Sequence, residues 1–443
     1  MTSVDHIQAW LEKNKIEDVE AFVPDMSGAA RGKVLPAEKF GSIELKLPEG
    51  VFAQTVSGDY ATDKENVEDR DMVLHPDPTT LRPVPYFPAP AASVFADCTD
   101  RDGLPVETSP RHVLRKVLKF YESKGWNPVV APEVEFYLIN PHSDPNEEVE
   151  PPVGRLGWTE TSKQPYSIDT MNAFEPFIND VYAYCEVQDI KIDTLLQELG
   201  PGQFELNFLH GNAVDLADQV LLFKRTVREA AIAHKLHATF LARPMSEEAG
   251  SALHIHQSVV DKNGNNIFSN ADGTASDLFT GYIGGLQKYM PHALLVFAPY
   301  PNSYRRFLSY WSSPVNLDWA VDNRTVGLRV PDSSPESRRV ENRIAGADVN
   351  PYLVLASTLA CGYLGMVEGC KPDDPIDGSA YDLPFSLHRF LYEAIDAFES
   401  SGAMRQMLGD KFVSLYSEVK KTECNEFQEI VTPWEREILM FNV

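Results

Sequence analysis

Two acidic residues stand where an ordinary core strand would carry valine or isoleucine. They are Glu133 and Glu135 in the segment Pro132-Glu133-Val134-Glu135-Phe136. Positions two apart share one face of a strand, so the two carboxylates point the same way. Buried side by side, they are costly unless they are protonated or bound to a cation. The pair predicts a cation site, with a solvated strand face as the alternative.

Two further segments have the same character. Glu198 and Glu205 flank a Gly-Pro-Gly turn, which folds them toward each other in a hairpin. His254 and His256 are again two apart, and Gly250 before them permits close backbone approach to a ligand. The alternatives are a pair of surface acids beside a loop and two hydrogen-bonded structural histidines.

Arginines form the last group. They lie in Arg338-Arg339-Val340-Glu341-Asn342-Arg343, in the stretch 323–329 and in Asn302–Arg306, all within apolar contexts of an acidic chain. Converging arginines suit carboxylate and phosphoryl oxygens. With the acids they indicate Mg²⁺ or Mn²⁺ and phosphoryl transfer. The sequence has neither a phosphate-binding P-loop nor a dinucleotide glycine fingerprint, so a nucleotide would be held through metals and arginines.

Strands and helices alternate around these segments. We predict a strand over Pro128–Ile139, two strands around the Gly-Pro-Gly turn and a strand over Ser251–Val260. Predicted helices cover Pro110–Lys124, with Ser109 as N-cap, and then Thr170–Gln188 and Leu216–His234. This pattern predicts an α+β fold with an antiparallel sheet backed by helices.

The first hundred residues differ from the rest. Short strands are predicted at Ala21–Pro24, Lys33–Pro36 and Met72–His75. Residues 75–93 are dense in proline, which excludes a regular helix or a central strand and predicts an extended surface passage. A domain boundary is expected near Arg101–Ser109.

Composition excludes several partners. The 443 residues carry a formal net charge of -26, which disfavours nucleic acid and anionic membrane surfaces. The scattered cysteines include no Cys-x-x-Cys pair, so neither a disulfide framework nor a thiolate zinc site is expected.

The apolar stretch Tyr352–Val367 is interrupted by polar residues and predicts a buried helix. The amphipathic start lacks an apolar signal core, and we expect a cytoplasmic protein.

The ordered motifs together resemble the glutamine synthetase family over nearly the whole chain. The similarity runs from Asp71-Met72-Val73-Leu74 through Asn350-Pro351-Tyr352 to Val431-Thr432-Pro433. It implies a small N-terminal β-grasp domain over residues 1–105 and a catalytic domain over 106–443, built on a curved antiparallel half-barrel. It also implies a homo-oligomer, a hexameric ring or a double-ring dodecamer, with active sites between subunits.

The resemblance also implies roles for individual residues. One metal would be held by Glu135, Glu198 and Glu205, and a second by Glu133, His254 and Glu341. Glutamate would contact Gly250, Arg306 and Arg343, and the phosphates would contact Arg324, Arg329 and Arg343. Adenosine would lie near Phe208, His256 and Ser258. The implied cofactors are ATP and two or three Mg²⁺ or Mn²⁺ ions, with Arg306, Arg324 and Arg343 acting in catalysis. The implied reaction joins glutamate to an amine through γ-glutamyl phosphate.

Departures from the family pattern concern the amine. Ser312 stands where ammonia-using members have a glutamate that takes the proton, and the N-terminal segment around Val56–Tyr60 lacks the expected ammonium-site motif. We therefore expect a primary amine bulkier than ammonia, with aromatic or apolar amines favoured slightly over polyamines. The chain looks most like the γ-glutamylpolyamine synthetase branch. The predicted amine pocket comprises Asp59, Tyr60, Tyr310, Trp311 and Ser312.

Other departures touch the nucleotide and glutamate sites. Glu336 stands where many members have a lysine near the nucleotide, and Ala249 replaces an asparagine beside the glutamate pocket.

The competing functions are a non-catalytic ring protein, a true ammonia-using glutamine synthetase and a metal-dependent hydrolase of γ-glutamyl amides. Phosphate-type arginines argue against the hydrolase, and the full set of expected ligands argues against the non-catalytic ring.

Overall fold

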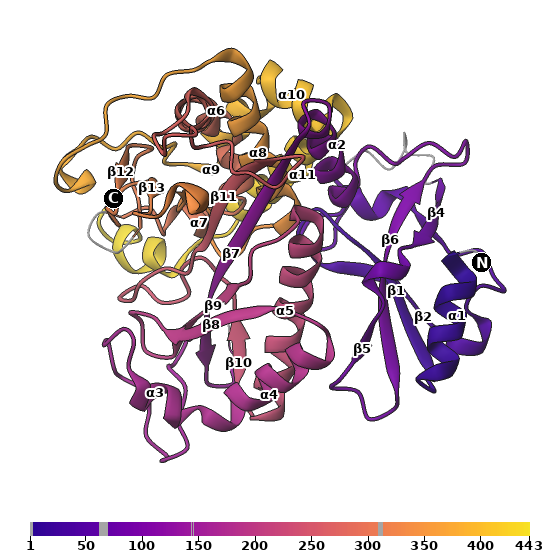
Figure 1. The fold of residues 1–443 in the computed structure, drawn as a ribbon. Helices are drawn as coiled ribbons and strands as arrows, with labels where there is room; N and C mark the ends of the chain where they lie inside the picture. Colours follow the sequence, from indigo (N-terminus) through magenta and orange to yellow (C-terminus); the bar gives the residue numbers. More distant parts are fainter. Residues whose placement is uncertain (1–2, 62–69, 143, 145, 309–312) are drawn as a thin grey trace.

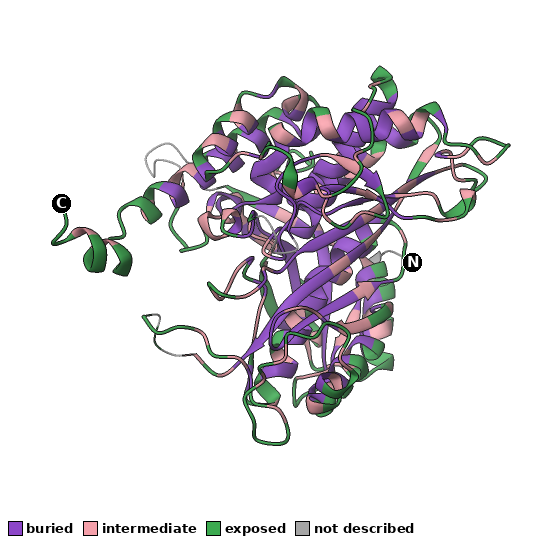
Figure 2. Cartoon of the chain, turned by 90° about the vertical axis from the view of Figure 1, so that its left-hand side faces the viewer, coloured by how far each residue is buried: buried purple, intermediate pink, exposed green. Residues whose placement is uncertain are grey.

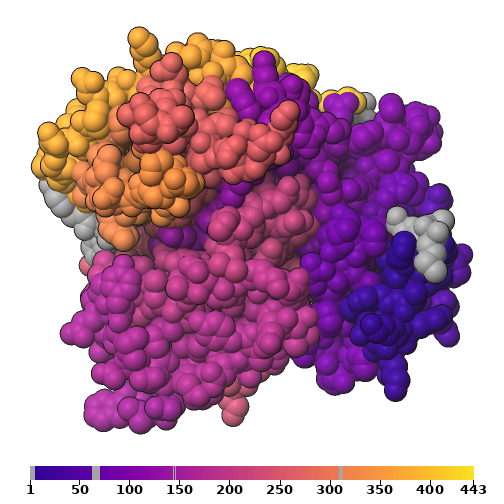
Figure 3. All heavy atoms as spheres, in the orientation of Figure 1, coloured from indigo at the N-terminus to yellow at the C-terminus, as the bar shows by residue number. Residues whose placement is uncertain are grey.

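The computed structural model describes residues 3–61, 70–142, 144, 146–308 and 313–443. These residues form two β-sheets with helices packed on and between them, which confirms the predicted α+β class (Figure 1). In the space-filling view, the indigo and violet N-terminal part occupies one side of the molecule, and the orange and yellow C-terminal part covers the top (Figure 3).

The N-terminal sheet is mixed and six-stranded. Its order is β2-β1-β6-β4-β3, with β5 also paired to β6, and only β1 and β6 run parallel. The strands are β1 Asp18–Pro24, β2 Ala30–Pro36, β3 Lys46–Pro48, β4 Asp71–Pro76, β5 Arg82–Val84 and β6 Ala91–Thr99. The three short strands predicted here are confirmed. Between β4 and β6 the proline-rich passage holds a 3-10 turn at Pro78–Thr80 and the edge strand β5, where proline's missing N–H group is tolerated. Its last residues begin the central strand β6 at Ala91, so the exclusion of a central strand fails there. Helix α1, Ser3–Lys13, buries Ile7 and Leu11.

The larger sheet carries the candidate site. It has eight strands in the order β12-β13-β14-β11-β7-β9-β8, with β10 paired to β7. The strands are β7 Trp126–Ile139, β8 Ile192–Gln197, β9 Gln203–Phe208, β10 His237–Thr239, β11 Leu253–Asp261, β12 Trp319–Val321, β13 Leu328–Val330 and β14 Val340–Asn342. All pairs are antiparallel, as predicted, except β12 with β13, which run parallel at the sheet edge. The two sheets share no strand pairing within the described ranges, and the division between residues 105 and 106 stays a prediction.

Helices cover the larger sheet. They are α2 Pro110–Glu122, α3 Ile168–Ala173, α4 Glu175–Val187, α5 Ala213–Ala233, α6 Asp277–Phe297, α7 Pro301–Tyr304, α8 Pro351–Glu368, α9 Leu391–Glu399, α10 Gly402–Leu408 and α11 Asp410–Gln428. The single helix predicted over 170–188 is broken at Phe174, because Pro176 has no N–H for the helical hydrogen-bond ladder. Ser109 stands at the N-cap of α2, but its side chain makes no capping hydrogen bond.

Helix α8 lies in the core. It packs on α6 so closely that a Cβ added at Gly285 would lie 2.4 Å from the carbonyl oxygen of Cys361. By length and composition alone α8 is apolar enough to cross a membrane, yet 89% of its residues in that window are buried in the fold. The predicted buried helix is therefore confirmed. Long strands and core helices are buried through the middle of the molecule, while an exposed C-terminal segment extends away from it (Figure 2).

Candidate active site

Strand register brings the predicted ligands together on the larger sheet. Glu133 on β7 pairs opposite His254 on β11, and Glu135 pairs opposite Glu205 on β9. On the other side of β11, His256 pairs opposite Glu341 on β14. Directly opposed side chains lie on the same face of an antiparallel sheet. Six strand residues from distant parts of the sequence therefore share one face of the half-barrel.

The first cluster is made of carboxylates. One oxygen from each of Glu135, Glu198 and Glu205 lies within 4.8 Å of the others. Burial and the neighbouring charge of Glu198 raise the pKa of Glu135 to about 8. Burial, followed by the charges of Glu133 and Glu135, raises the pKa of Glu205 well above its usual range. A bound divalent cation would remove this repulsion, and an all-oxygen donor set is the one that Mg²⁺ and Mn²⁺ prefer.

The second cluster adds imidazoles. Glu133 Oε2 lies 3.4 Å from His254 Nδ1, and Glu341 Oε1 lies 3.8 Å from the same nitrogen. Burial opposes ionisation of Glu133, but its hydrogen bonds with the two histidines hold its pKa below the usual range. Burial, and then the charge of Arg343, lowers the pKa of His254 to about 4. A neutral imidazole is the form that binds metal, so these side chains also fit a cation.

One orphaned atom supports this fit. His254 Nε2 is buried and has no hydrogen-bond partner among the described residues. His256, predicted only for adenosine, instead lies with its Nε2 2.9 Å from Glu133 Oε1 and groups with Glu133 and Glu341. His256 also lines a cavity of about 620 Å³, described below, so it lies beside both the predicted metal site and the predicted adenosine site.

The arginines surround the acids. Arg329 and Arg343 both pair with Glu341. Burial opposes ionisation of that carboxyl, but the charges of Arg343 and then of the two histidines lower its pKa to about 2. Arg306 is buried and donates to the carbonyl oxygens of Ile344 at 2.8 Å and Arg343 at 3.0 Å. Burial lowers its pKa to about 10, so it stays charged at neutral pH. Arg324 is exposed on the turn between β12 and β13, and its charge reaches Glu198.

Gly250 packs directly against Arg306. A Cβ added at Gly250 would lie 2.6 Å from the carbonyl oxygen of Ala242 and 2.8 Å from Arg306 Cγ. The Gly250 carbonyl accepts a hydrogen bond from Gln203 Nε2 at 3.1 Å. The absence of a side chain therefore fixes how closely this backbone approaches the guanidinium, in agreement with the predicted place of Gly250 beside glutamate.

Substitution of Gly250 should therefore impair glutamate binding much more than ATP binding. We expect Gly250→Ala to displace Arg306 and to raise the KM for glutamate by at least about tenfold, since one tenth of the affinity corresponds to about 1.4 kcal/mol. The KM for ATP should change much less. Gly402→Ala is the matched control, because a Cβ there meets nothing within 4 Å. An equal rise in the KM values for glutamate and ATP would contradict the placement of Gly250 beside the glutamate site.

A cavity of about 620 Å³ lies beside the second cluster. Its lining includes the predicted adenosine residues Phe208, His256 and Ser258, together with Glu336 and Arg339. Arg339 was not predicted as a site residue, although it lies in the arginine run noted in the sequence. Its Nε donates to His256 Nδ1 at 3.2 Å and so orients that ring.

Gln203 is a second residue that sequence reasoning missed. Its Nε2 donates to Glu135 Oε2 at 3.2 Å, and the backbone N–H of Ala252 donates to the same oxygen at 2.8 Å. Gln203 lies two positions before Glu205 on β9, so its place on the same strand face was the available signal. The pair of donors holds Glu135 toward the cluster.

The predicted amine pocket is only partly described. Tyr310, Trp311 and Ser312 lie outside the described residues. Asp59 and Tyr60 are exposed and line neither the large cavity nor the smaller one beside Arg306. Their loop is held by α11, through Val56 N–H to Glu423 Oε1 at 2.8 Å and Ser57 Oγ to Glu426 Oε2 at 2.7 Å. Within the described part of one chain, these predicted pocket residues do not join the acidic clusters.

Metal removal should make stability depend on pH. His254, whose pKa is lowered to about 4, binds more protons in the unfolded chain only below about pH 6.5. Above that pH the raised pKa values of Glu135 and Glu205 mean that the folded, chelated protein binds more protons than the unfolded chain. Its stability should fall, on the order of a few kcal/mol, as the pH rises from 6.5 to about 8.5. Mg²⁺ should abolish this slope, because it replaces the protons. Unfolding midpoints with chelator and with Mg²⁺ test this, and parallel pH profiles would contradict it.

A half-barrel that gathers acids, imidazoles and arginines on one face beside a large cavity belongs to the class of metal-dependent phosphoryl-transfer sites. Residues 107–439 match the glutamine synthetase catalytic domain. The chain belongs to the glutamine synthetase family, which confirms the resemblance of its ordered motifs. The family uses ATP and divalent metal ions.

Relatives in this family include ligases for organic amines. The chain is 33% identical over 434 residues to γ-glutamylputrescine synthetase PuuA of Escherichia coli (strain K12), covering 96% of this chain and 92% of that protein. It is 31% identical over 449 residues to glutamate–isopropylamine ligase of a Pseudomonas species, covering 97% and 96%. The solved GmaS/ADP complex matches with a TM-score of 0.84 at 25% identity, covering 97% of this chain and 98% of that one.

Proposed function

We propose that this chain is an ATP-dependent ligase that joins the γ-carboxyl group of L-glutamate to a primary amine. A γ-carboxylate oxygen attacks the γ-phosphorus of ATP and releases ADP, giving γ-glutamyl phosphate. The amine nitrogen then attacks the γ-carbonyl carbon, loses a proton and expels phosphate. Divalent cations, when bound, neutralise the phosphate charge.

One observation carries this proposal: strand register places the two acidic clusters on one face, between buried Arg306 and the 620 Å³ cavity. In the proposed reaction Arg306 grips the α-carboxylate of glutamate, since a guanidinium binds a carboxylate through paired hydrogen bonds. Arg343, Arg324 and Arg329 attract the phosphates of the nucleotide in the cavity. These roles agree with the residues' predicted roles.

The amine is proposed to be larger than ammonia. A site for ammonium needs a nearby carboxylate, and Ser312 stands at the position where ammonia-using members have one. Relatives named for putrescine and isopropylamine agree with an organic amine. We propose an aromatic or apolar amine first and a polyamine second, with Asp59, Tyr60, Tyr310, Trp311 and Ser312 in the amine pocket.

Release of phosphate from ATP tests the function. The assay contains the full chain, glutamate, Mg²⁺ and one amine at a time: ammonia, isopropylamine, 2-phenylethylamine or putrescine. We expect turnover that needs both glutamate and an organic amine, and replacing the amine by hydroxylamine should trap γ-glutamyl hydroxamate. Strong turnover with ammonia would indicate a true glutamine synthetase and overturn the interpretation of Ser312.

Two other outcomes separate the alternatives. Metal binding without phosphate release from any amine would favour a non-catalytic ring protein. Hydrolysis of a γ-glutamyl amide without ATP would favour a hydrolase. The ring itself is also a proposal: the full chain should sediment as a hexamer or a dodecamer. We propose that the exposed loop with Asp59 and Tyr60 contacts a neighbouring subunit in that ring. The cytoplasmic location stays a prediction.

A further inference from the structure

A buried serine faces the smaller cavity beside Arg306. Ser313 is only 2% exposed, and its Oγ has no hydrogen-bond partner among the described residues. The cavity that it lines is also lined by Glu135, Glu198, Gly250 and Arg306. These four residues belong to the candidate active site through other contacts, so the hydroxyl lies at that site and not in a separate region of the core.

An unpaired buried hydroxyl is unusual. Polar groups inside proteins are nearly always hydrogen-bonded, because losing water without gaining a partner costs free energy. Three other serines, Ser251 beside Gly250, Ser357 on α8 and Ser417 on α11, are also fully buried with no Oγ partner among the described residues. They line neither the cavity beside Arg306 nor the larger one. Ser313 differs because it lines a cavity of about 20 Å³ beside Arg306, which is room for about one water-sized group such as a single carboxylate oxygen.

The chemistry of the lining identifies the ligand. Arg306 supplies a buried cation and Glu135 and Glu198 supply the acids of the first cluster, while Gln203 donates to Glu135 and to the Gly250 carbonyl. The Ser313 hydroxyl adds a neutral donor to this set. A carboxylate oxygen accepts such a donor well, and its charge strengthens the hydrogen bond.

We propose that Ser313 is a substrate-binding residue whose Oγ donates a hydrogen bond to a carboxylate oxygen of bound glutamate. This inference rests on the proposed ligase function and adds a glutamate contact to it. The orphaned hydroxyl of the free protein thus gains its partner on binding. Removing the hydroxyl should weaken glutamate binding while sparing the free fold, because no described residue forms a hydrogen bond with it.

The Ser313→Ala variant of the full chain tests this against wild type and the matched controls Ser357→Ala and Ser417→Ala. With Mg²⁺ and the best amine, we expect the KM for glutamate to rise roughly ten- to a hundredfold in Ser313→Ala, the range for a hydrogen bond to a charged group. The KM values for ATP and amine should stay within about twofold. The unfolding midpoint of the free variant should be equal to or above that of wild type. The controls should leave all three KM values unchanged.

Specific outcomes overturn the inference. The inference is wrong if the KM for glutamate is unchanged in Ser313→Ala. It is also wrong if the KM values for glutamate and ATP rise equally, or if only the KM for the amine rises. An unfolding midpoint below that of wild type would show that the Ser313 hydroxyl stabilises the fold. If wild type releases no phosphate with any amine, the ligase proposal fails. In that case calorimetry still tests the binding role of Ser313. Glutamate is titrated into wild type and Ser313→Ala in the presence of ATP and Mg²⁺, and equal affinities would contradict that role.

Discussion

Glu135→Ala should lower ligation by at least about a thousandfold while leaving the protein folded. The side chain belongs to the cluster with Glu198 and Glu205, and burial with the Glu198 charge raises its pKa to about 8. In the metal-free protein the ionised Glu135 carboxyl therefore destabilises the folded state. Its loss removes charge repulsion from the free protein and a ligand from the metal-bound one.

The measurement pairs activity with stability. Phosphate release should be lost, the unfolding midpoint without metal should stay equal or rise, and the increase in midpoint on adding Mg²⁺ should shrink. Glu186→Ala is the control, because Glu186 is an exposed acid on α4 that belongs to neither cluster and lines neither cavity. If Glu135→Ala instead unfolds the protein without metal, the carboxylate is structural and the cluster is not a cation site.

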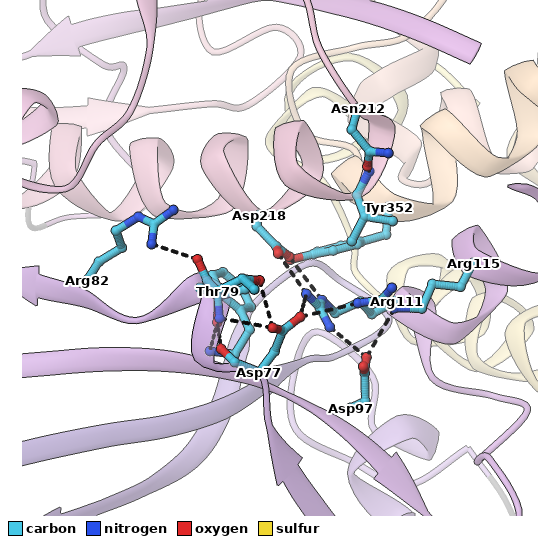
Figure 4. Close-up of polar contacts among 12 residues, drawn as sticks. Asp77, Thr79, Arg82, Asp97, Arg111, Arg115, Asn212, Asp218 and Tyr352 are labelled. Carbon is cyan, nitrogen blue, oxygen red and sulfur yellow. Dashed lines mark hydrogen bonds and ion pairs between the residues drawn. The ribbon is translucent and has the colours of Figure 1, made fainter. Parts of the chain in front are cut away.

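Arg111→Met should destabilise the fold by about 3–5 kcal/mol, the cost of leaving a buried charge without its partner. Arg111 lies at the start of α2, is 1% exposed and binds three aspartates (Figure 4). Its Nη2 lies 3.0 Å from Asp218 Oδ2 on α5 and 2.8 Å from Asp77 Oδ2, and its Nη1 lies 2.7 Å from Asp97 Oδ1 on β6. This side chain joins the six-stranded sheet to the helices of the larger part.

Arg115 offers a matched control one helical turn away. It contacts the same Asp77 and Asp97, at 3.3 and 3.5 Å, but its side chain is 39% exposed. A solvated ion pair contributes about 1 kcal/mol or less, so Arg115→Ala should be nearly neutral. Denaturant unfolding at fixed protein concentration tests both variants. A loss below about 1 kcal/mol for Arg111→Met would contradict the role of the buried network. Asp218→Asn should recover part of the stability in the Arg111→Met background.

Much of the site could be predicted because its signals are local. Alternation along a strand places Glu133 with Glu135, and His254 with His256, on shared faces whatever the rest of the fold does. The Gly-Pro-Gly turn likewise fixes the hairpin that carries Glu198 and Glu205. Local rules failed where two signals competed, as at Phe174, where Pro176 ended a helix that the apolar pattern continued.

The sequence by itself determined the family, the α+β class, the buried helix α8 and the residue types that meet at the site. Only the tertiary structure decided which of them face each other: His256 lies beside Glu133, Arg329 and Arg343 pair with Glu341, and Ser313 Oγ has no partner in the described part of the chain. Short-range pattern fixes a side chain's direction within its own strand. Register between strands distant in sequence depends on the packing of the whole sheet, which no single segment encodes.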